Sequence, residues 1–95
     1  MKLTLEWMSQ LRVAAGTALQ VLDCPDGVQL TEALEQAIAE LPDDRSEALR
    51  PLVLVDGRRV SALLVALDGV QVLTDGNPEL RPGSTLVLSS PIAGG

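Results

Sequence analysis

The sequence has 95 residues, enough for one folded domain, and 46% of them are apolar, which excludes a disordered chain. A formal net charge of −6 argues against binding to nucleic acid or to an anionic membrane, since both need a basic surface on the protein. Histidine and tyrosine are absent and Cys24 is the single cysteine, so we expect no metal site, no intramolecular disulfide and no self-sufficient enzyme.

The N-terminal quarter of the sequence predicts two strands joined by a turn. Apolar and polar residues alternate over residues 2–9, which is the period of a strand with one buried face. A turn at residues 15–17 leads to a second strand over residues 18–24, so the two strands form a hairpin that ends at residues 25–27. The side chains that share a face are Leu3, Leu5 and Trp7 in the first strand, and Leu19 and Val21 in the second.

An amphipathic helix follows the hairpin. Apolar residues recur at the spacing i, i+3, i+4, i+7, i+8 and i+11, which places them in one stripe along a helix. Thr31 is the expected N-cap, and Pro42 is expected to stop the helix. The apolar stripe consists of Leu30, Ala33, Leu34, Ala37, Ile38 and Leu41.

The second half of the sequence predicts the remaining strands. Residues 43–50 are polar and form a loop or a short helical turn, and the apolar run 52–55 before a turn predicts a buried central strand. Further apolar stretches follow at residues 60–67 and 70–73, and the last strand is expected at residues 85–89. In that last strand one face carries Leu86 and Leu88, and the other face carries Val87 and Ser89.

The order of these elements predicts the fold class. Two strands, one helix and several returning strands cannot form a simple βαβ series, whereas a mixed sheet packed on one main helix satisfies the pattern. This α+β arrangement is the ubiquitin-like β-grasp. We expect residues 1–90 to form the β-grasp domain and residues 91–95 to form a flexible C-terminal tail.

The last dipeptide of the sequence is Gly94-Gly95. A terminal Gly-Gly arises by chance in roughly one chain in 200, given a glycine content of about 7%, and a frayed chain end is its plain alternative interpretation. Here it follows the expected last strand of a β-grasp order, which favours a function. The run Gln10-Leu11-Arg12 with Gly16, and the run from Leu80 to Leu88 with the tail behind it, resemble the molybdopterin-synthase small subunit of the MoaD/ThiS-type sulfur-carrier family.

The resemblance implies a carrier rather than an enzyme, at most the small subunit of a sulfurtransferase complex. It implies that an E1-like enzyme consumes ATP to adenylate the Gly95 carboxylate, and that a persulfide sulfurtransferase supplies the sulfur that displaces AMP. The resulting thiocarboxylate would donate sulfur in molybdopterin (molybdenum cofactor) biosynthesis, inside an acceptor such as the molybdopterin-synthase large subunit. No permanently bound cofactor is implied.

The candidate site residues lie in the tail and beside it. Glycine lets a backbone thread a narrow channel because it has no Cβ, and proline can end sheet pairing because it has no N–H, although prolines also follow strands without a function. The resemblance implies that Gly95 is the site of activation, and the residues expected for tail recognition are Gly94, Ala93, Ile92 and Pro91.

Three further residues are candidates for partner docking. Met8 and Val87 face away from the expected core, so they predict an exposed apolar patch, the alternative being partial cover by loops. The resemblance suggests that Arg12 pairs with an acidic residue of the activating enzyme, and an ordinary surface arginine is the alternative.

Other functions stay open at this point. The chain is alternatively a sulfur carrier for thiamine, cysteine or tRNA thiolation, a ubiquitin-like protein modifier joined through Gly95 to a target lysine, or a β-grasp interaction module. Lys2 is the only lysine, so branched self-chains would be severely limited. No signal peptide is visible, since Glu6 interrupts the first apolar segment, and we expect a cytoplasmic protein.

Overall fold

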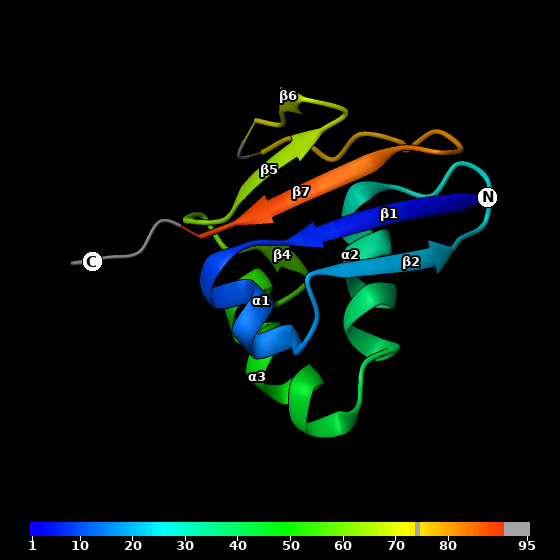
Figure 1. Ribbon diagram of the computed structural model, residues 1–95. Coiled ribbons are helices and arrows are strands. Elements are labelled where there is room, and N and C mark those ends of the chain that lie inside the picture. The colour runs from blue at the N-terminus through cyan, green and yellow to red at the C-terminus, as the bar shows by residue number, and fades with distance from the viewer. Residues whose placement is uncertain (74, 91–95) are drawn as a thin grey trace.

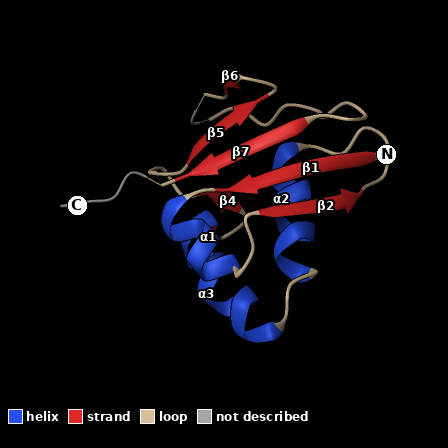
Figure 2. Cartoon of the chain, viewed as in Figure 1, coloured by secondary structure: helices blue, strands red, loops and turns tan. Residues whose placement is uncertain are grey.

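The computed structural model describes residues 1–73 and 75–90 of the chain. Figure 2 shows that the helices of this described part lie on one face of a sheet. None of them is long and apolar enough to cross a membrane. In chain order the elements are β1 (Lys2–Trp7), α1 (Ser9–Ala15), β2 (Leu19–Asp23), α2 (Leu30–Ala39), α3 (Asp43–Val53), β3 (Leu54–Val55), β4 (Arg58–Arg59), β5 (Leu64–Leu67), β6 (Val70–Gln71) and β7 (Thr85–Ser89).

The main sheet is mixed, as expected. Within the described residues it has five strands in the order β2-β1-β7-β5-β6 (Figure 1). At its centre β1 and β7 are parallel, with Thr4 beside Thr85 and Trp7 beside Leu88, whereas β1–β2, β5–β7 and β5–β6 are antiparallel. The first and last strands of the described chain therefore lie side by side in the middle of the sheet.

The core lies between the sheet and the helices. Alternation along β1 buries Leu3, Leu5 and Trp7, each 0% exposed, and the faces predicted for this strand are confirmed. Each fully buried leucine contributes roughly 1.5–3 kcal/mol through removal of apolar surface from water. The other residues at 0% exposure in β7 and α2 are Leu86, Leu88, Leu30, Ala33, Leu34, Ala37 and Ile38.

Helix α1 is an element that the sequence did not reveal, so the simple hairpin is wrong. The first strand ends at Trp7 rather than at residue 9, and seven helical residues follow before the chain turns into β2. Only Leu11 and Ala15 are buried in this helix, and a stripe of two residues is too short to show a helical period. Gly16 ends the helix with φ +76°, a left-handed conformation that favours glycine.

Helix α2 is confirmed, but its N-cap is Gln29 rather than Thr31. The side chains of Gln29 and Glu32 form a reciprocal capping box around the first turn. Thr31 lies inside the helix, where its N–H and its hydroxyl donate to Oδ1 of Asn77 at 3.0 and 3.3 Å. The helix ends before Pro42, which becomes the N-cap residue of α3.

Two expectations for residues 43–55 are corrected. The polar segment 43–50 lies in a regular helix of 11 residues, α3, rather than in a loop or a single turn. The apolar run 52–55 is not a central strand, because it completes α3 and then pairs with β4 in a separate two-stranded sheet. Leu49 and Val53 are buried one helical turn apart, and a short apolar run does not distinguish a helix end from a strand.

Candidate functional site

The candidate site begins at the end of β7, the strand that leads to the predicted tail. Its bounds, Thr85–Ser89, agree with the prediction from the sequence. Backbone pairing with β1 on one side and β5 on the other fixes the end of this strand in the middle of the sheet. The five residues predicted to form the tail lie outside the described residues, so the roles predicted for them stay predictions. They are Pro91, Ile92, Ala93, Gly94 and Gly95.

Two apolar side chains flank the end of β7. The backbone N–H of Met8 donates to the carbonyl of Leu88 at 2.9 Å, which continues the β1–β7 ladder by one step. The Met8 side chain is 39% exposed and, by alternation from Trp7, points to the outer face of the sheet. On the other side of β7, Leu64 lies opposite Ser89 and is 43% exposed.

Val87 lies on the same outer face and is half-buried. It stands between Glu6 of β1 and Ala66 of β5 in the ladder. We call Met8, Leu64 and Val87 the tail-side patch. The structure thus brings Met8 and Val87 onto one face, as predicted, and adds Leu64. The sequence did not reveal Leu64, because residues 60–67 are apolar throughout most of their length and show no alternation that would set its face.

The outer face of β2 carries two more exposed apolar residues. Leu19 and Val21 share a face, as predicted, but it is the solvent-facing one, and each is 59% exposed. The buried residue of this strand is Leu22. In the ladder Glu6 stands between Leu19 and Val87, so a carboxylate separates these two residues from the tail-side patch.

Arg12 lies one helical turn after Met8. Its N–H approaches the Met8 carbonyl at 3.4 Å, and its side chain is exposed. The Arg12 guanidinium has no hydrogen-bond or ion-pair partner among residues 1–73 and 75–90. Within the described part of the chain, an exposed cation without an ion-pair partner therefore lies one helical turn from Met8 of the tail-side patch.

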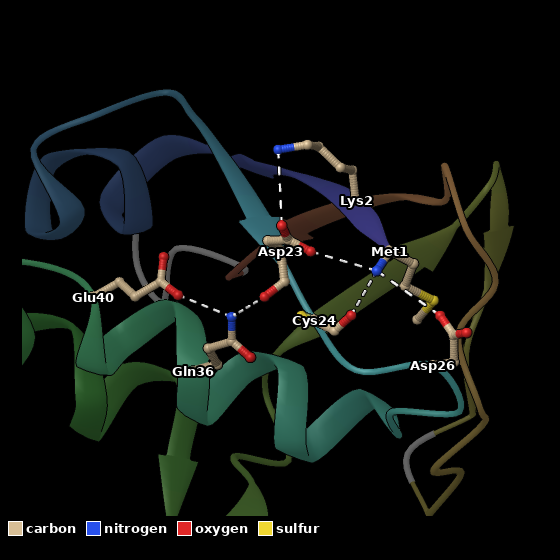
Figure 3. Close-up of polar contacts among 7 residues, drawn as sticks. All are labelled: Met1, Lys2, Asp23, Cys24, Asp26, Gln36 and Glu40. Atoms are coloured by element: carbon tan, nitrogen blue, oxygen red, sulfur yellow. Dashed lines mark hydrogen bonds and ion pairs between the residues drawn. The ribbon is translucent and has the colours of Figure 1, made fainter.

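A polar cluster lies at the opposite end of β1 (Figure 3). The ammonium group of Met1 donates to the carbonyl of Cys24 at 2.7 Å and lies 3.4 Å from Oδ1 of Asp23 and 3.8 Å from Oδ1 of Asp26. Nζ of Lys2 lies 4.0 Å from Oδ2 of Asp23. The Met1 side chain is 2% exposed, whereas that of Lys2 is 75% exposed.

The cysteine in this cluster has neither the exposure nor the lowered pKa that is typical of a reactive thiol. Cys24 is 3% exposed, and burial raises the pKa of its thiol, with Glu40 and Asp23 acting in the same direction and the Met1 ammonium opposing them. A reactive cysteine needs a lowered pKa and an accessible sulfur. Beside it, Gln36 donates to the carbonyl of Asp23 at 2.8 Å and to Glu40 at 2.9 Å, which ties α2 to the end of β2 (Figure 3).

A cleft of about 460 Å³ lies between the β3–β4 turn, the loop around residue 76 and the start of α2. Arg59 donates to the carbonyl groups of Leu73 and Gly76, and burial lowers the pKa of its guanidinium, with Asp75 opposing that change. The N-terminal N–H groups of α2 are already bonded to residues 29, 77 and 78, so they offer no donor to an anion. In the described part no group of three or more cysteine, aspartate or glutamate side chains gathers to hold a metal ion.

Comparison with known proteins gives matches to solved structures alone, since no family model and no curated protein sequence matches. SAMP1 from Haloferax volcanii is 19% identical, with 100% of each chain covered and a TM-score of 0.81. The small archaeal modifier protein 1 (SAMP1) from Methanosarcina acetivorans is 18% identical, with 99% and 96% covered and a TM-score of 0.75. A putative molybdopterin converting factor, subunit 1, from Pyrococcus furiosus is 17% identical, with 97% and 99% covered and a TM-score of 0.68.

The fold is the ubiquitin-like β-grasp. This confirms the fold class predicted from the sequence, and it confirms the resemblance to the MoaD/ThiS-type family at the level of fold. The match runs over essentially the whole of each chain, so the β-grasp includes α1 and α3 as well as the main helix α2. At identities of 17–19% the likeness is one of fold.

Proposed function

We propose that this chain is a ubiquitin-like sulfur carrier that is activated at the carboxylate of Gly95. The observation that carries the proposal is the position of Gly94-Gly95 in the sequence, a few residues after β7, the strand at the centre of a β-grasp sheet. Structures with the same fold are named as small archaeal modifier proteins and as a molybdopterin converting factor subunit, which supports a function at the C-terminus.

The chemistry of the proposal requires activation before transfer. A carboxylate is a poor acyl donor, so an E1-like enzyme first joins the Gly95 carboxylate to AMP from ATP, with release of pyrophosphate. A persulfide sulfur then attacks the carbonyl carbon and AMP leaves with the bonding electron pair. This step forms a C–S bond and gives an acyl disulfide, which still contains the S–S bond of the persulfide. A second thiol then cleaves that S–S bond, which leaves a thiocarboxylate at Gly95 and a disulfide between the second thiol and the thiol that carried the persulfide.

Docking of the activating enzyme would use the tail-side patch and Arg12. Met8 and Leu64 stand on either side of the end of β7, so a partner that covers both holds the point at which the tail starts. Apolar surface of this kind contributes to binding through its burial, and Arg12, which has no ion-pair partner within the described residues, adds selectivity for an acidic partner surface. The protein acts as a substrate of its partners, and ATP is consumed by the activating enzyme.

The proposed acceptor is the large subunit of molybdopterin synthase, which would receive the tail in its active site. The name of the Pyrococcus furiosus structure supports this assignment. A second candidate is a protein modifier, in which the activated Gly95 forms an isopeptide with a lysine of another protein. The names of the two SAMP1 structures support that candidate.

Intact mass tests the proposal. The protein is incubated with ATP, a persulfide sulfur donor and the E1-like enzyme of the same genome, and the expected product carries sulfur in place of one oxygen at Gly95. A variant that lacks Gly94 and Gly95 serves as the control, and it should keep the circular dichroism spectrum of the intact protein. Absence of both adenylate and thiocarboxylate, with the enzyme active on a known carrier, would overturn the proposal.

The acceptor is tested in a second step. Thiocarboxylated protein is mixed with the molybdopterin-synthase large subunit and its substrate, and sulfur transfer is expected. If the thiocarboxylate forms but no sulfur moves, while Gly95 is found linked to lysines in cell extract, the modifier candidate replaces the carrier.

A further inference from the structure

The two edges of the main sheet differ in whether their backbone groups are free to bind another strand. The edge strands are β2 and β6 (Figure 1). An edge strand directs every second residue's backbone N–H and C=O toward solvent, and these groups can pair with an extended segment of another molecule. The hydrogen bonds that they already make therefore decide where this sheet can accept a further strand.

The outer side of β2 is largely closed to a further strand. Hydrogen bonds at Ala18 and Cys24 set the alternation of its ladder with β1, in which the even-numbered residues face β1. The residues whose backbone groups face away from β1 are Leu19, Val21 and Asp23. The carbonyl of Leu19 accepts a hydrogen bond from the Thr17 hydroxyl at 2.8 Å. The carbonyl of Asp23 accepts one from Nε2 of Gln36, also at 2.8 Å (Figure 3), so two of these three carbonyls are satisfied within the protein.

The outer side of β6 is open. The N–H of Val72 donates to the carbonyl of Val65 at 2.8 Å, so the next pair of the ladder, Ala66 with Gln71, exchanges no hydrogen bonds. The backbone N–H and C=O of Gln71 consequently point away from β5, and neither has a partner within residues 1–73 and 75–90. One residue of an extended segment can therefore pair with both groups.

An apolar groove of about 500 Å³ lies beside β6. Val70 and Leu73 line it and are 70% and 75% exposed, so the described part of the chain leaves most of their surface uncovered. The loop that forms the far wall is held close to the strand. A Cβ at Gly76 would lie 3.2 Å from the carbonyl oxygen of Leu73, and Arg59 donates to the carbonyls of both residues. We call Val70, Gln71 and Leu73 with this groove the β6 edge.

We propose that the β6 edge binds an extended segment of a partner protein, one that carries apolar side chains at alternate positions and at least one lysine or arginine. The segment adds a strand to the sheet. Its backbone pairs with Gln71, and its apolar side chains cover Val70 and Leu73, so main-chain hydrogen bonds contribute affinity and the groove contributes specificity. This binding needs neither the C-terminal residues nor their activation, so it goes beyond the proposed function.

Charge favours a basic segment over a second copy of this chain. Residues 68–79 contain the carboxylates of Asp68, Asp75 and Glu79, all of them exposed, and contain no lysine or arginine. The guanidinium of Arg59 contacts this segment, but it is bonded to the carbonyls of the loop. Two copies joined at their β6 edges would bring these carboxylates together, and each copy has a net charge of −6. Such like-charge contacts oppose association, whereas a lysine or arginine on the partner is attracted.

A display library of random heptapeptides, with the whole protein as bait, tests the inference. We expect the selected peptides to carry apolar residues at alternate positions and to be enriched in lysine and arginine. A synthetic copy of the most enriched peptide is then added to the protein, and hydrogen exchange of the Gln71 amide is expected to slow in the complex. No enrichment, peptides without this pattern, or an unchanged exchange rate at Gln71 would overturn the inference.

Two apolar residues of similar exposure supply a matched pair of variants. Leu73→Ser removes apolar surface from the β6 edge, and Val13→Ser makes the same kind of change at a 71% exposed position of α1. Substitutions at exposed positions change stability little, so both proteins are expected to fold. Isothermal titration calorimetry with the selected peptide should show binding weakened at least tenfold by Leu73→Ser and less than twofold by Val13→Ser. Equal affinities of the two variants would overturn the inference.

A second pair of variants tests the backbone contact. Proline is tolerated at an edge-strand position whose N–H faces solvent, and it removes that donor. Gln71→Pro should weaken peptide binding, whereas Val21→Pro, which removes a solvent-facing N–H from β2, should not. Equal effects of the two variants would contradict strand addition at β6. Light scattering of the free protein tests the other occupant, because a dimer that Leu73→Ser dissociates would replace the partner segment by a second copy and overturn the inference.

Discussion

The indole N–H of Trp7 donates a hydrogen bond to Oε1 of Gln20 at 3.0 Å. Nε2 of Gln20 donates in turn to the carbonyl of Ala37 at 2.8 Å, so one amide side chain joins β1, β2 and α2. Trp7 is 0% exposed and is the only aromatic residue of the chain, so Gln20 supplies the partner that a buried indole N–H requires.

Replacement of Gln20 by leucine is expected to destabilise the fold. The variant Gln20→Leu has a side chain of similar size but leaves the Trp7 N–H without an acceptor, which costs about 1–3 kcal/mol. Urea unfolding followed by Trp7 fluorescence measures the loss of free energy of unfolding. The matched control is Gln71→Leu on exposed β6, which should change that free energy by less than about 0.5 kcal/mol. Equal losses in the two variants would contradict the role given to Gln20.

Replacement of Gly16 by alanine is expected to cost more than the same change at Gly27. Both glycines have φ near +80°, at +76° and +80°, where an L-residue is strained by about 1–2 kcal/mol. A Cβ at Gly16 would also lie 2.9 Å from Nε of Arg45, whereas a Cβ at Gly27 meets nothing within 4 Å. Arg45 would have to shift, and its hydrogen bond to the carbonyl of Val13 would weaken.

The test compares the free energies of unfolding of four variants, which are Gly16→Ala, Gly27→Ala, Arg45→Ala and the double variant Gly16→Ala/Arg45→Ala. The excess loss at Gly16 should shrink once Arg45 is truncated. If the excess persists in the double variant, the contact with Arg45 is not its cause.

A charge in the tail-side patch is expected to weaken activation without weakening the fold. Met8 is the N-cap residue of α1 and makes no side-chain cap hydrogen bond, so Met8→Asp supplies a favourable cap while it places a charge beside β7. We expect a Tm equal to or above that of the wild type and a KM for adenylation raised about tenfold, measured by pyrophosphate exchange. Val13→Asp, at a 71% exposed position of the same helix, serves as the control. An unchanged KM for Met8→Asp would remove this patch from the docking surface.

The thiol of Cys24 is expected to make stability fall at alkaline pH. Burial raises its pKa in the folded state above that of the unfolded state, so the folded protein binds more protons in this range. The contribution is present below the pKa of the unfolded thiol and is lost as the pH rises toward that of the folded thiol. Urea midpoints measured from pH 7 to pH 10 should decline more steeply for the wild type than for Cys24→Ala. Parallel curves for the two proteins would contradict this linkage.

The elements predicted correctly from the sequence are those in which the apolar residues repeat at the full period of a strand or a helix. The alternation of Leu3, Leu5 and Trp7 with polar residues is sufficient to predict β1, and the long apolar stripe is sufficient to predict α2. Helix α1 has only two buried residues, and the end of α3 is as apolar as a strand. The two helices pack on each other, α1 packs also on β1 and β7, and α3 packs also on α2, and a local sequence pattern does not contain these contacts.

The residues of the candidate site also divide into those that a local pattern predicts and those whose position depends on distant contacts. Met8 and Val87 were predicted for the outer face because successive residues of a strand point to alternate faces, and their sequence neighbours Trp7 and Leu88 point to the core. Leu64 could not be predicted, since its face depends on its register with Ser89, which lies far along the chain. The Thr31 N–H at the start of α2 donates to Oδ1 of Asn77, which is distant in sequence. Because the local sequence does not show this contact, Thr31 was predicted to be the N-cap itself.

The parallel pairing of Thr4 with Thr85 has a consequence for how the chain folds. The central ladder closes a loop that contains nearly the whole sequence, so its entropic cost must be met before β1 gains its neighbour. Pairing of this kind raises the contact order and slows folding. During synthesis β1 and β2 emerge before β7, so the nascent chain exposes one edge of β1 until β7 has been made. Chaperone binding to this exposed strand edge is therefore expected to be strongest just before β7 is made.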